Sequence, residues 1–205
     1  MKNIFRLILI IISIQLFIGC GQKESTDKQT KENYKYEVIF DTDANNELDD
    51  QHALAYLLFN GNTFDVKGVT VNTTFNGGNI DKHYEEAERV ITLCGLSGKI
   101  PLYRGADSAF EDIRPGLENT DFDGYQAVNF IIDQAQQVRG EKLIVIAVGK
   151  LTNVALALEK EPSISDKIRL VWLGANYPDP GEYNLVNDIP AMNYLLESGI
   201  DFEMV

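Results

Sequence analysis

The feature of this sequence that most constrains its fold is a series of short apolar segments that alternate with helix-like patterns. Residues 143–148 are all apolar, and residues 168–173 contain one charged position. A strand without polar alternation is buried on both faces, which is typical of a parallel sheet covered by helices. Helical patterns follow such segments, as at residues 49–60, where Ala53, Leu54, Leu57 and Leu58 share one face. The sequence therefore predicts an α/β fold with a doubly wound, mostly parallel, Rossmann-like sheet.

The expected elements follow one another in the order strand, helix, strand. Strands are predicted over residues 37–40, 64–71, 100–103, 142–148, 168–173 and 202–205. Helices are predicted over residues 49–60, 81–94, 123–138, 151–158 and 187–197. Residues 104–120 are expected to form a loop, either a lid or a plain connection. The last strand of a parallel sheet normally needs a covering helix, so we expect this sequence to be the front part of a longer domain, incomplete at the C-terminus.

A cluster of acidic residues directly follows the first predicted strand. Asp41, Asp43, Glu47, Asp49 and Asp50 lie within ten residues. Ionised carboxylates this close together repel one another, and they resist burial unless a cation accompanies them. Oxygen ligands favour Ca²⁺ or Mg²⁺ over Zn²⁺. The alternative is a solvated acidic loop, but the carboxyl end of a strand is where open α/β sheets place their sites.

The N-terminus has the pattern of a bacterial lipoprotein signal. Lys2 and Arg6 precede a largely apolar run at residues 7–18, which ends at Gly19-Cys20. We expect cleavage before Cys20, lipid on its sulfur, and anchoring in the cell envelope, on the periplasmic or outer-membrane face. The alternative is a single membrane anchor, for which the run is short. Residues 1–20 are thus the predicted signal peptide, residues 21–36 a flexible polar tether, and residues 37–205 the folded domain.

Charge and cysteine content exclude several classes of function. Without Lys2 and Arg6 the chain carries 16 basic and 31 acidic residues, a formal charge of −15. Such a charge argues against a nucleic-acid partner and suits a neutral or cationic ligand or a bound metal. With Cys20 used by the anchor, Cys94 is left alone, which excludes a disulfide framework and a cysteine-based zinc site. A homo-oligomer stays open.

Several motifs in order resemble the nucleoside hydrolase family of the inosine–uridine-preferring type. That family opens with a strand, Asp-x-Asp, a short turn and Asp-Asp-Ala-x-Ala. Here Asp41-Thr42-Asp43 is followed by Asp49-Asp50, although the turn is two residues longer than the commonest family form and lacks its Pro-Gly. The resemblance spans residues 37–205 through later motifs, namely Gly68-Val69-Thr70-Val71, Asn76, residues 101–106, residues 148–157, Glu182-Tyr183-Asn184 and residues 187–191.

The resemblance implies Ca²⁺-dependent hydrolysis of the N-glycosidic bond of ribonucleosides to ribose and free base, as in purine and pyrimidine salvage. It implies that Asp43 ligates Ca²⁺ and is the base toward the metal-bound water. It further implies that Asp50 and the backbone carbonyl of Thr152 are Ca²⁺ ligands. The reaction would pass through an oxocarbenium-like state, which an acidic site stabilises.

The same resemblance implies the sugar contacts. Those residues are Asp49, Asn76, Asn176, Glu182 and Asn184. Taken alone, Asn76 is typical of a turn, Thr152-Asn153 of a helix N-cap, and Glu182 and Asn184 of a polar loop. His52 and His83 fall on predicted helices and are expected to be surface or packing residues. The family's later His-Asp pair has no counterpart within these 205 residues.

Two other functions compete with hydrolysis of ribonucleosides. A phosphatase of the haloacid dehalogenase type also begins with strand-Asp-x-Asp, and Asp41 would then be the nucleophile and Asp43 the acid, with Mg²⁺. Asp49-Asp50 has no place in that motif. The non-enzyme alternative is a surface lipoprotein that binds a nucleoside or sugar on a degenerate hydrolase fold.

Overall fold

A computed structural model of the chain describes residues 35–176 and 181–205. The predicted signal peptide and Cys20 lie outside this range, as does all of the predicted tether except its last two residues, the second of which, Tyr36, begins the first strand. In the part that is described, no helix is long and apolar enough to cross a membrane.

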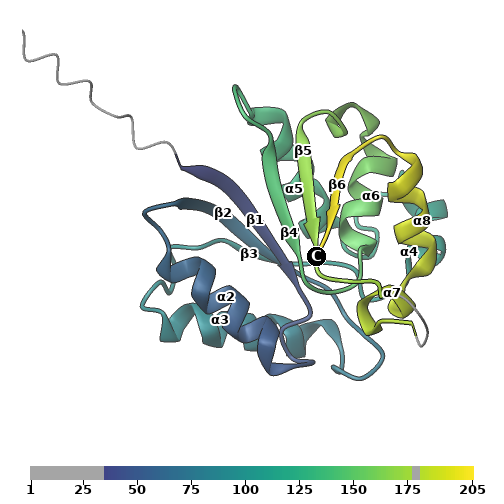
Figure 1. Ribbon diagram of the computed structural model, residues 1–205. Helices are drawn as coiled ribbons and strands as arrows, with labels where there is room; N and C mark the ends of the chain where they lie inside the picture. The colour runs from purple at the N-terminus through teal and green to yellow at the C-terminus, as the bar shows by residue number, and fades with distance from the viewer. Residues whose placement is uncertain (1–34, 177–180) are drawn as a thin grey trace, which may run out of the picture. The chain divides into compact units, whose positions relative to one another are not determined.

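The core is one sheet whose strands all run parallel, in the order β3-β2-β1-β4-β5-β6 (Figure 1). The strands are β1 (Tyr36–Thr42), β2 (Phe64–Val71), β3 (Leu102–Arg104), β4 (Leu143–Ala147), β5 (Ile168–Trp172) and β6 (Asp201–Met204). This is the doubly wound order, in which the chain reverses its direction of winding between β1 and β4. The prediction of an α/β parallel sheet is confirmed.

Helices cover both faces of the sheet (Figure 1). On one face lie α2 (Leu48–Phe59) and α3 (Ile80–Leu93), and on the other α5 (Tyr125–Gln137), α6 (Thr152–Lys160) and α8 (Ile189–Glu197). Alternation along β1 directs Val38 and Phe40 toward the face covered by α2 and α3, and Ile39 toward the face covered by α5, α6 and α8. All three side chains are at most 1% exposed. Burial of the strands on both sides explains why the apolar segments show no polar period.

The structure corrects the prediction in two segments. The predicted loop at residues 104–120 contains α4 (Phe110–Ile113) and a 3₁₀ turn, η1 (Arg114–Gly116). A second 3₁₀ turn, η2 (Pro162–Ile164), follows α6. The helix predicted at residues 187–197 is α8, which begins two residues later than expected. A separate short helix, α7 (Tyr183–Asn187), precedes it where polar loop residues were expected. Asp188 lies between the two helices and accepts a hydrogen bond from the Ala191 backbone N–H.

Candidate active site

The acidic cluster lies at the switch point of the sheet. In the β1–β2 register Thr42 stands beside Val71, and in the β1–β4 register Asp41 stands beside Ala147. The residues that follow β1, β2 and β4 therefore meet at one edge, outside the carboxyl ends of the strands. Open α/β sheets bind their ligands at this place.

Asp41 is the structural centre of this edge. It is fully buried, and one carboxylate oxygen accepts hydrogen bonds from Thr70 Oγ1 at 2.5 Å and Asn153 Nδ2 at 2.7 Å. The other oxygen accepts one from Asn72 Nδ2 at 2.6 Å. Burial raises the pKa of Asp41 to about 6, against the lowering effect of these hydrogen bonds. Asp41 thus joins β1, β2 and α6, and its oxygens are engaged by protein groups.

Asp43 has the opposite surroundings. Its side chain is fully buried, yet neither carboxylate oxygen has a hydrogen-bond partner among the described residues. A Cβ atom placed on Gly149 would lie 2.8 Å from Asp43 Oδ1 and 3.0 Å from Asn72 Oδ1, which is a further buried oxygen without a hydrogen-bond partner among the described residues. Burial raises the pKa of Asp43 to about 7, and the charge of Asp41 contributes to the rise. Unpaired buried carboxylates are costly, so this group of oxygens fits a cation.

Asp49 and Asp50 open α2, where the helix dipole favours negative charge. Asp49 is exposed, whereas Asp50 is 5% exposed. Burial raises the pKa of Asp50 to about 8, and the charges of Asp43 and Asp49 add to the effect. Asp43 and Asp50 are therefore close enough for their charges to interact, as one shared cation would require.

These raised pKa values predict how the stability of the metal-free protein depends on pH. The ordinary pKa of both carboxyl groups is 3.8, so the folded protein with values of about 7 and 8 holds their protons more tightly than the unfolded chain does. Because of these two groups, the free energy of unfolding of the metal-free protein falls as the pH rises from about 4 to about 8. In EDTA, we expect a lower melting temperature at pH 8.5 than at pH 6.5. Below pH 6.5 the buried His83, whose pKa burial lowers, acts in the opposite direction.

The control for this prediction is the double variant Asp43→Asn/Asp50→Asn, in which the slope between pH 6.5 and 8.5 should largely disappear. Circular dichroism melts of both proteins, with and without Ca²⁺, measure it. An equal slope in the double variant would show that other groups cause the dependence.

A cavity of about 220 Å³ opens next to the acidic cluster. Four predicted site residues line it, namely Asp49, Asp50, Glu182 and Asn184. Glu47, from the longer turn, and Tyr183 also line it, and neither was given a role from the sequence. The cavity thus brings together the start of α2 and the start of α7, which are far apart in the sequence.

Glu182 and Asn184 hold the backbone that forms one wall of this cavity. The Glu182 carboxylate accepts hydrogen bonds from the backbone N–H groups of Asn184 and Leu185 and so caps α7. Asn184 Nδ2 donates to the backbone carbonyls of Val148 and Leu173, each at 2.8 Å. The start of α7 is thereby fixed against the ends of β4 and β5.

Asn76 and Asn176 lie elsewhere. Both side chains are exposed, and neither is among the described residues that line the cavity. The Asn76 backbone N–H donates to the Tyr183 hydroxyl at 3.2 Å, so this loop contacts α7 through its backbone. Asn176 directly precedes the undescribed residues 177–180. Their predicted sugar contacts stay predictions.

Thr152 is fully buried at the start of α6. Its hydroxyl donates to Asp188 Oδ2 at 2.5 Å, and the same oxygen accepts the Phe110 backbone N–H at 2.8 Å. Asp188 therefore binds α6, α4 and α8 together, a role that local sequence does not show. The helix N-cap position belongs to Leu151, so Thr152 is the first helical residue.

Lys150 is a buried charged residue whose role is not evident from the sequence. It is 4% exposed, and its Nζ donates to the Ser108 carbonyl at 2.8 Å and the Asp107 carbonyl at 3.4 Å. Burial lowers the pKa of Lys150. These hydrogen bonds connect the loop after β3 to the segment after β4. The first part of this loop is therefore held in a fixed position.

The two histidines differ in their surroundings. His52 is exposed on α2. His83 is fully buried on α3, and its Nδ1 accepts a hydrogen bond from the Asn45 backbone N–H.

The oxygen atoms around Asp43 are suitable ligands for a hard cation. In the described ranges, no three His, Cys, Asp or Glu side chains are grouped as a metal site. The oxygens at hand come from the carboxylates of Asp43 and Asp50 and the amide of Asn72. Ca²⁺ accepts carboxylate, amide and carbonyl oxygens alike, so it is compatible with this mixed set.

The sequence profile of the inosine-uridine preferring nucleoside hydrolases matches residues 38–205. The chain belongs to this family. One curated relative, "Probable uridine nucleosidase 2" from Oryza sativa, is 29% identical to this nucleoside hydrolase-family chain. The alignment covers 82% of this chain and 55% of that protein. An inosine-uridine preferring nucleoside hydrolase from Crithidia fasciculata is 26% identical, with 82% and 59% aligned.

Solved nucleoside hydrolases share the fold. A plant nucleoside hydrolase superposes with a TM-score of 0.67 at 22% identity, covering 84% of this chain and 60% of the other. A purine-preferring ribonucleoside hydrolase from Gardnerella vaginalis gives a TM-score of 0.64 at 24% identity, covering 82% and 60%. The chain thus spans a little over half the length of the relatives that it matches.

Proposed function

We propose that this chain supplies the cation-binding and ribose-binding part of a ribonucleoside N-ribosyl hydrolase. The observation that carries the proposal is Asp43, a fully buried carboxylate whose two oxygens have no partner in the described residues. Asp43 and Asp50, with the carbonyl of Thr152, would hold Ca²⁺. The Asn72 amide oxygen is an additional candidate ligand. When bound, Ca²⁺ makes water more acidic.

Asp43 would accept the proton of the attacking water, because it lies at the carboxyl end of β1 and is less acidic than an ordinary carboxyl group. Asp49, Glu182 and Asn184 line the neighbouring cavity and would hold the ribose hydroxyls, together with Asn76 and Asn176 from the surrounding loops. The negative charge of the cluster would stabilise the positive charge that develops on the sugar when the bond to the base breaks.

The test is release of free base from uridine and inosine, measured by chromatography with the full-length protein. We expect turnover in Ca²⁺, loss of turnover in EGTA, and a decrease of about 10²–10⁴-fold in Asp43→Asn. Turnover that neither EGTA nor this substitution changes would contradict the proposal. Binding of uridine without turnover would favour the non-catalytic nucleoside-binding protein.

The phosphatase alternative conflicts with the surroundings of Asp41. In that reaction Asp41 would attack a phosphate, but its side chain is fully buried and holds three hydrogen bonds from Thr70, Asn72 and Asn153. A nucleophile needs an accessible oxygen, which Asp41 lacks. We expect no activity on p-nitrophenyl phosphate.

Gly149 provides a separate test of the cation site. An added Cβ would approach Asp43 Oδ1 to 2.8 Å and Asn72 Oδ1 to 3.0 Å, and so would occupy space beside both oxygens. We expect Gly149→Ala to weaken Ca²⁺ binding at least tenfold in isothermal titration calorimetry. Gly140→Ala is the matched control, because a Cβ there meets nothing within 4 Å. Equal affinity in the two variants would place the cation elsewhere.

We also propose that Cys20 is the lipidation site that anchors the protein in the cell envelope, on the strength of the Lys2, Arg6 and Gly19-Cys20 pattern. Metabolic labelling with palmitate should tag the wild-type protein and leave Cys20→Ser unlabelled. Equal labelling of the two proteins would contradict the proposal.

A further inference from the structure

His83 is a buried polar residue that the proposed reaction does not use. It lies in the first half of α3, and none of its surface is exposed. A buried imidazole needs hydrogen bonds to offset the loss of water. Its partner belongs to another part of the chain, the turn that connects β1 with α2.

A hydrogen bond from the Asn45 backbone defines the orientation of the His83 imidazole. The backbone N–H of Asn45 donates to His83 Nδ1 at 3.3 Å, across 38 residues of sequence. A nitrogen that accepts a hydrogen bond carries no proton, so in the neutral ring the proton resides on Nε2, which has no hydrogen-bond partner among the described residues. The hydrogen bond from the Asn45 N–H is thus the one that the imidazole makes within the described ranges. This interaction therefore depends on an acceptor at the Nδ1 position.

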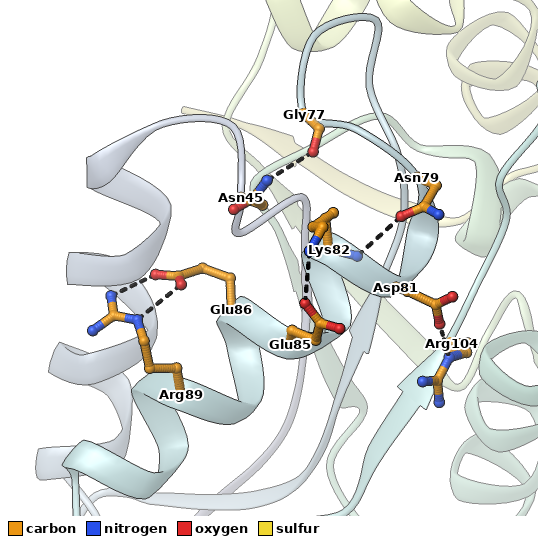
Figure 2. Close-up of polar contacts among 9 residues, drawn as sticks. All are labelled: Asn45, Gly77, Asn79, Asp81, Lys82, Glu85, Glu86, Arg89 and Arg104. Carbon is orange, nitrogen blue, oxygen red and sulfur yellow. Dashed lines mark hydrogen bonds and ion pairs between the residues drawn. The ribbon is translucent and has the colours of Figure 1, made fainter.

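The loop after β2 packs against the imidazole ring of His83 as well. A Cβ on Gly77 would lie 2.2 Å from His83 Cε1, so the loop after β2 rests directly on the imidazole. The Asn45 side chain then donates from Nδ2 to the Gly77 carbonyl at 2.8 Å (Figure 2). The turn after β1, the loop after β2 and α3 thus meet at His83.

The N-terminal half of α3 is itself held in place. Asn79 caps the helix by accepting a hydrogen bond from the Lys82 backbone N–H, and Asp81 pairs with Arg104 of β3 at 2.8 Å (Figure 2). Arg104 also stacks over the Tyr84 ring at 3.9 Å. Exposed pairs like these contribute little singly, but they give His83 a defined position relative to the sheet.

The turn that His83 holds lies between the two carboxylates of the proposed cation site. Asp43 precedes it and Asp50 follows it, and the Asn46 backbone N–H closes the turn on the Asp43 carbonyl at 2.8 Å. A free turn would have to be ordered each time both carboxylates bind one cation, which costs conformational entropy. We infer that His83 is a positioning residue, which pre-orders the turn at residues 44–47 through the Asn45 hydrogen bond so that Asp43 and Asp50 reach the same cation.

This inference rests on the proposed cation site, and its test compares two substitutions. His83→Asn keeps an acceptor oxygen at the Nδ1 position, whereas His83→Leu is of similar bulk and has no acceptor. In calorimetric titration with Ca²⁺ alone, we expect His83→Leu to bind at least tenfold more weakly than wild type and His83→Asn to bind within about threefold. Val90→Ala, on the buried side of the same helix, is the control for general destabilisation.

We expect Val90→Ala to lower the melting temperature without changing Ca²⁺ affinity. His83→Leu with wild-type affinity would overturn the inference, as would an equal loss of affinity in Val90→Ala. If wild type itself binds no Ca²⁺, the proposed function fails, and hydrogen exchange at the Asn45 amide still tests His83 in the metal-free protein. Faster exchange in His83→Leu than in His83→Asn is expected there, and equal exchange in both would contradict the role.

Discussion

Asp43→Asn is expected to make the metal-free protein more stable while it weakens Ca²⁺ binding more than about a hundredfold and slows ribonucleoside hydrolysis by about 10²–10⁴-fold. The wild-type carboxylate is buried without a partner in the described residues, and its pKa is raised from 3.8 to about 7. A rise of that size corresponds to about 4 kcal/mol of destabilisation when the group is ionised. An asparagine amide is also polar and would be buried at the same place, so we expect a gain of only about 1–3 kcal/mol, or several degrees in melting temperature at pH 8 in EDTA.

The same substitution removes a charge from the cation site. Loss of one partner of a buried charge pair costs about 3–5 kcal/mol, which is more than a hundredfold in affinity. Thermal melts in EDTA and titration with Ca²⁺ measure the two effects on one sample. A variant that is less stable than wild type without metal, or that binds Ca²⁺ equally well, would contradict the role given to Asp43.

Asp41→Asn is expected to have the opposite effect on stability. Asp41 accepts three buried hydrogen bonds, from Thr70, Asn72 and Asn153. An asparagine replaces one acceptor oxygen by an NH₂ group, which would face a donor. Leaving buried donors unsatisfied costs about 1–3 kcal/mol each. Removal of the buried charge, whose pKa is raised to about 6, offsets part of this cost, so we expect a net loss of about 1–2 kcal/mol in the free energy of unfolding.

Urea unfolding of Asp41→Asn and of Asp49→Asn measures this contrast. Asp49 is exposed in the same acidic cluster, and its substitution should change stability by less than about 0.5 kcal/mol. A loss in Asp41→Asn no larger than that in Asp49→Asn would show that the Asp41 hydrogen bonds are not needed for folding.

The strand pattern predicted most of the fold because burial acts on every residue of a central strand. The run at residues 143–148 and the helix after Asp49 were located to within a few residues. The position of the acidic cluster was predictable for a related reason, since residues that follow neighbouring parallel strands must share one edge of the sheet.

Short helices and long-range hydrogen bonds were not predictable in the same way. A helix of four residues such as α4 is too short to show an apolar period. The partners of Asp41 come from 31 and 112 residues away, as Asn72 and Asn153, and nothing in their local sequence marks them. The division between α7 and α8 did have a signal, because Asp188 followed by Pro190 is typical of a helix start.

Calorimetric titration of the wild-type protein with Ca²⁺ at pH 7, in two buffers of different ionisation enthalpy, tests the cation site most directly. Asp43 and Asp50 have pKa values of about 7 and 8 without metal, so both carry protons part of the time and must lose them to bind a cation. We predict one Ca²⁺ per chain and release of about one proton, seen as a binding heat that depends on the buffer. Absence of Ca²⁺ binding, or binding without proton release, would contradict a calcium site formed by Asp43 and Asp50.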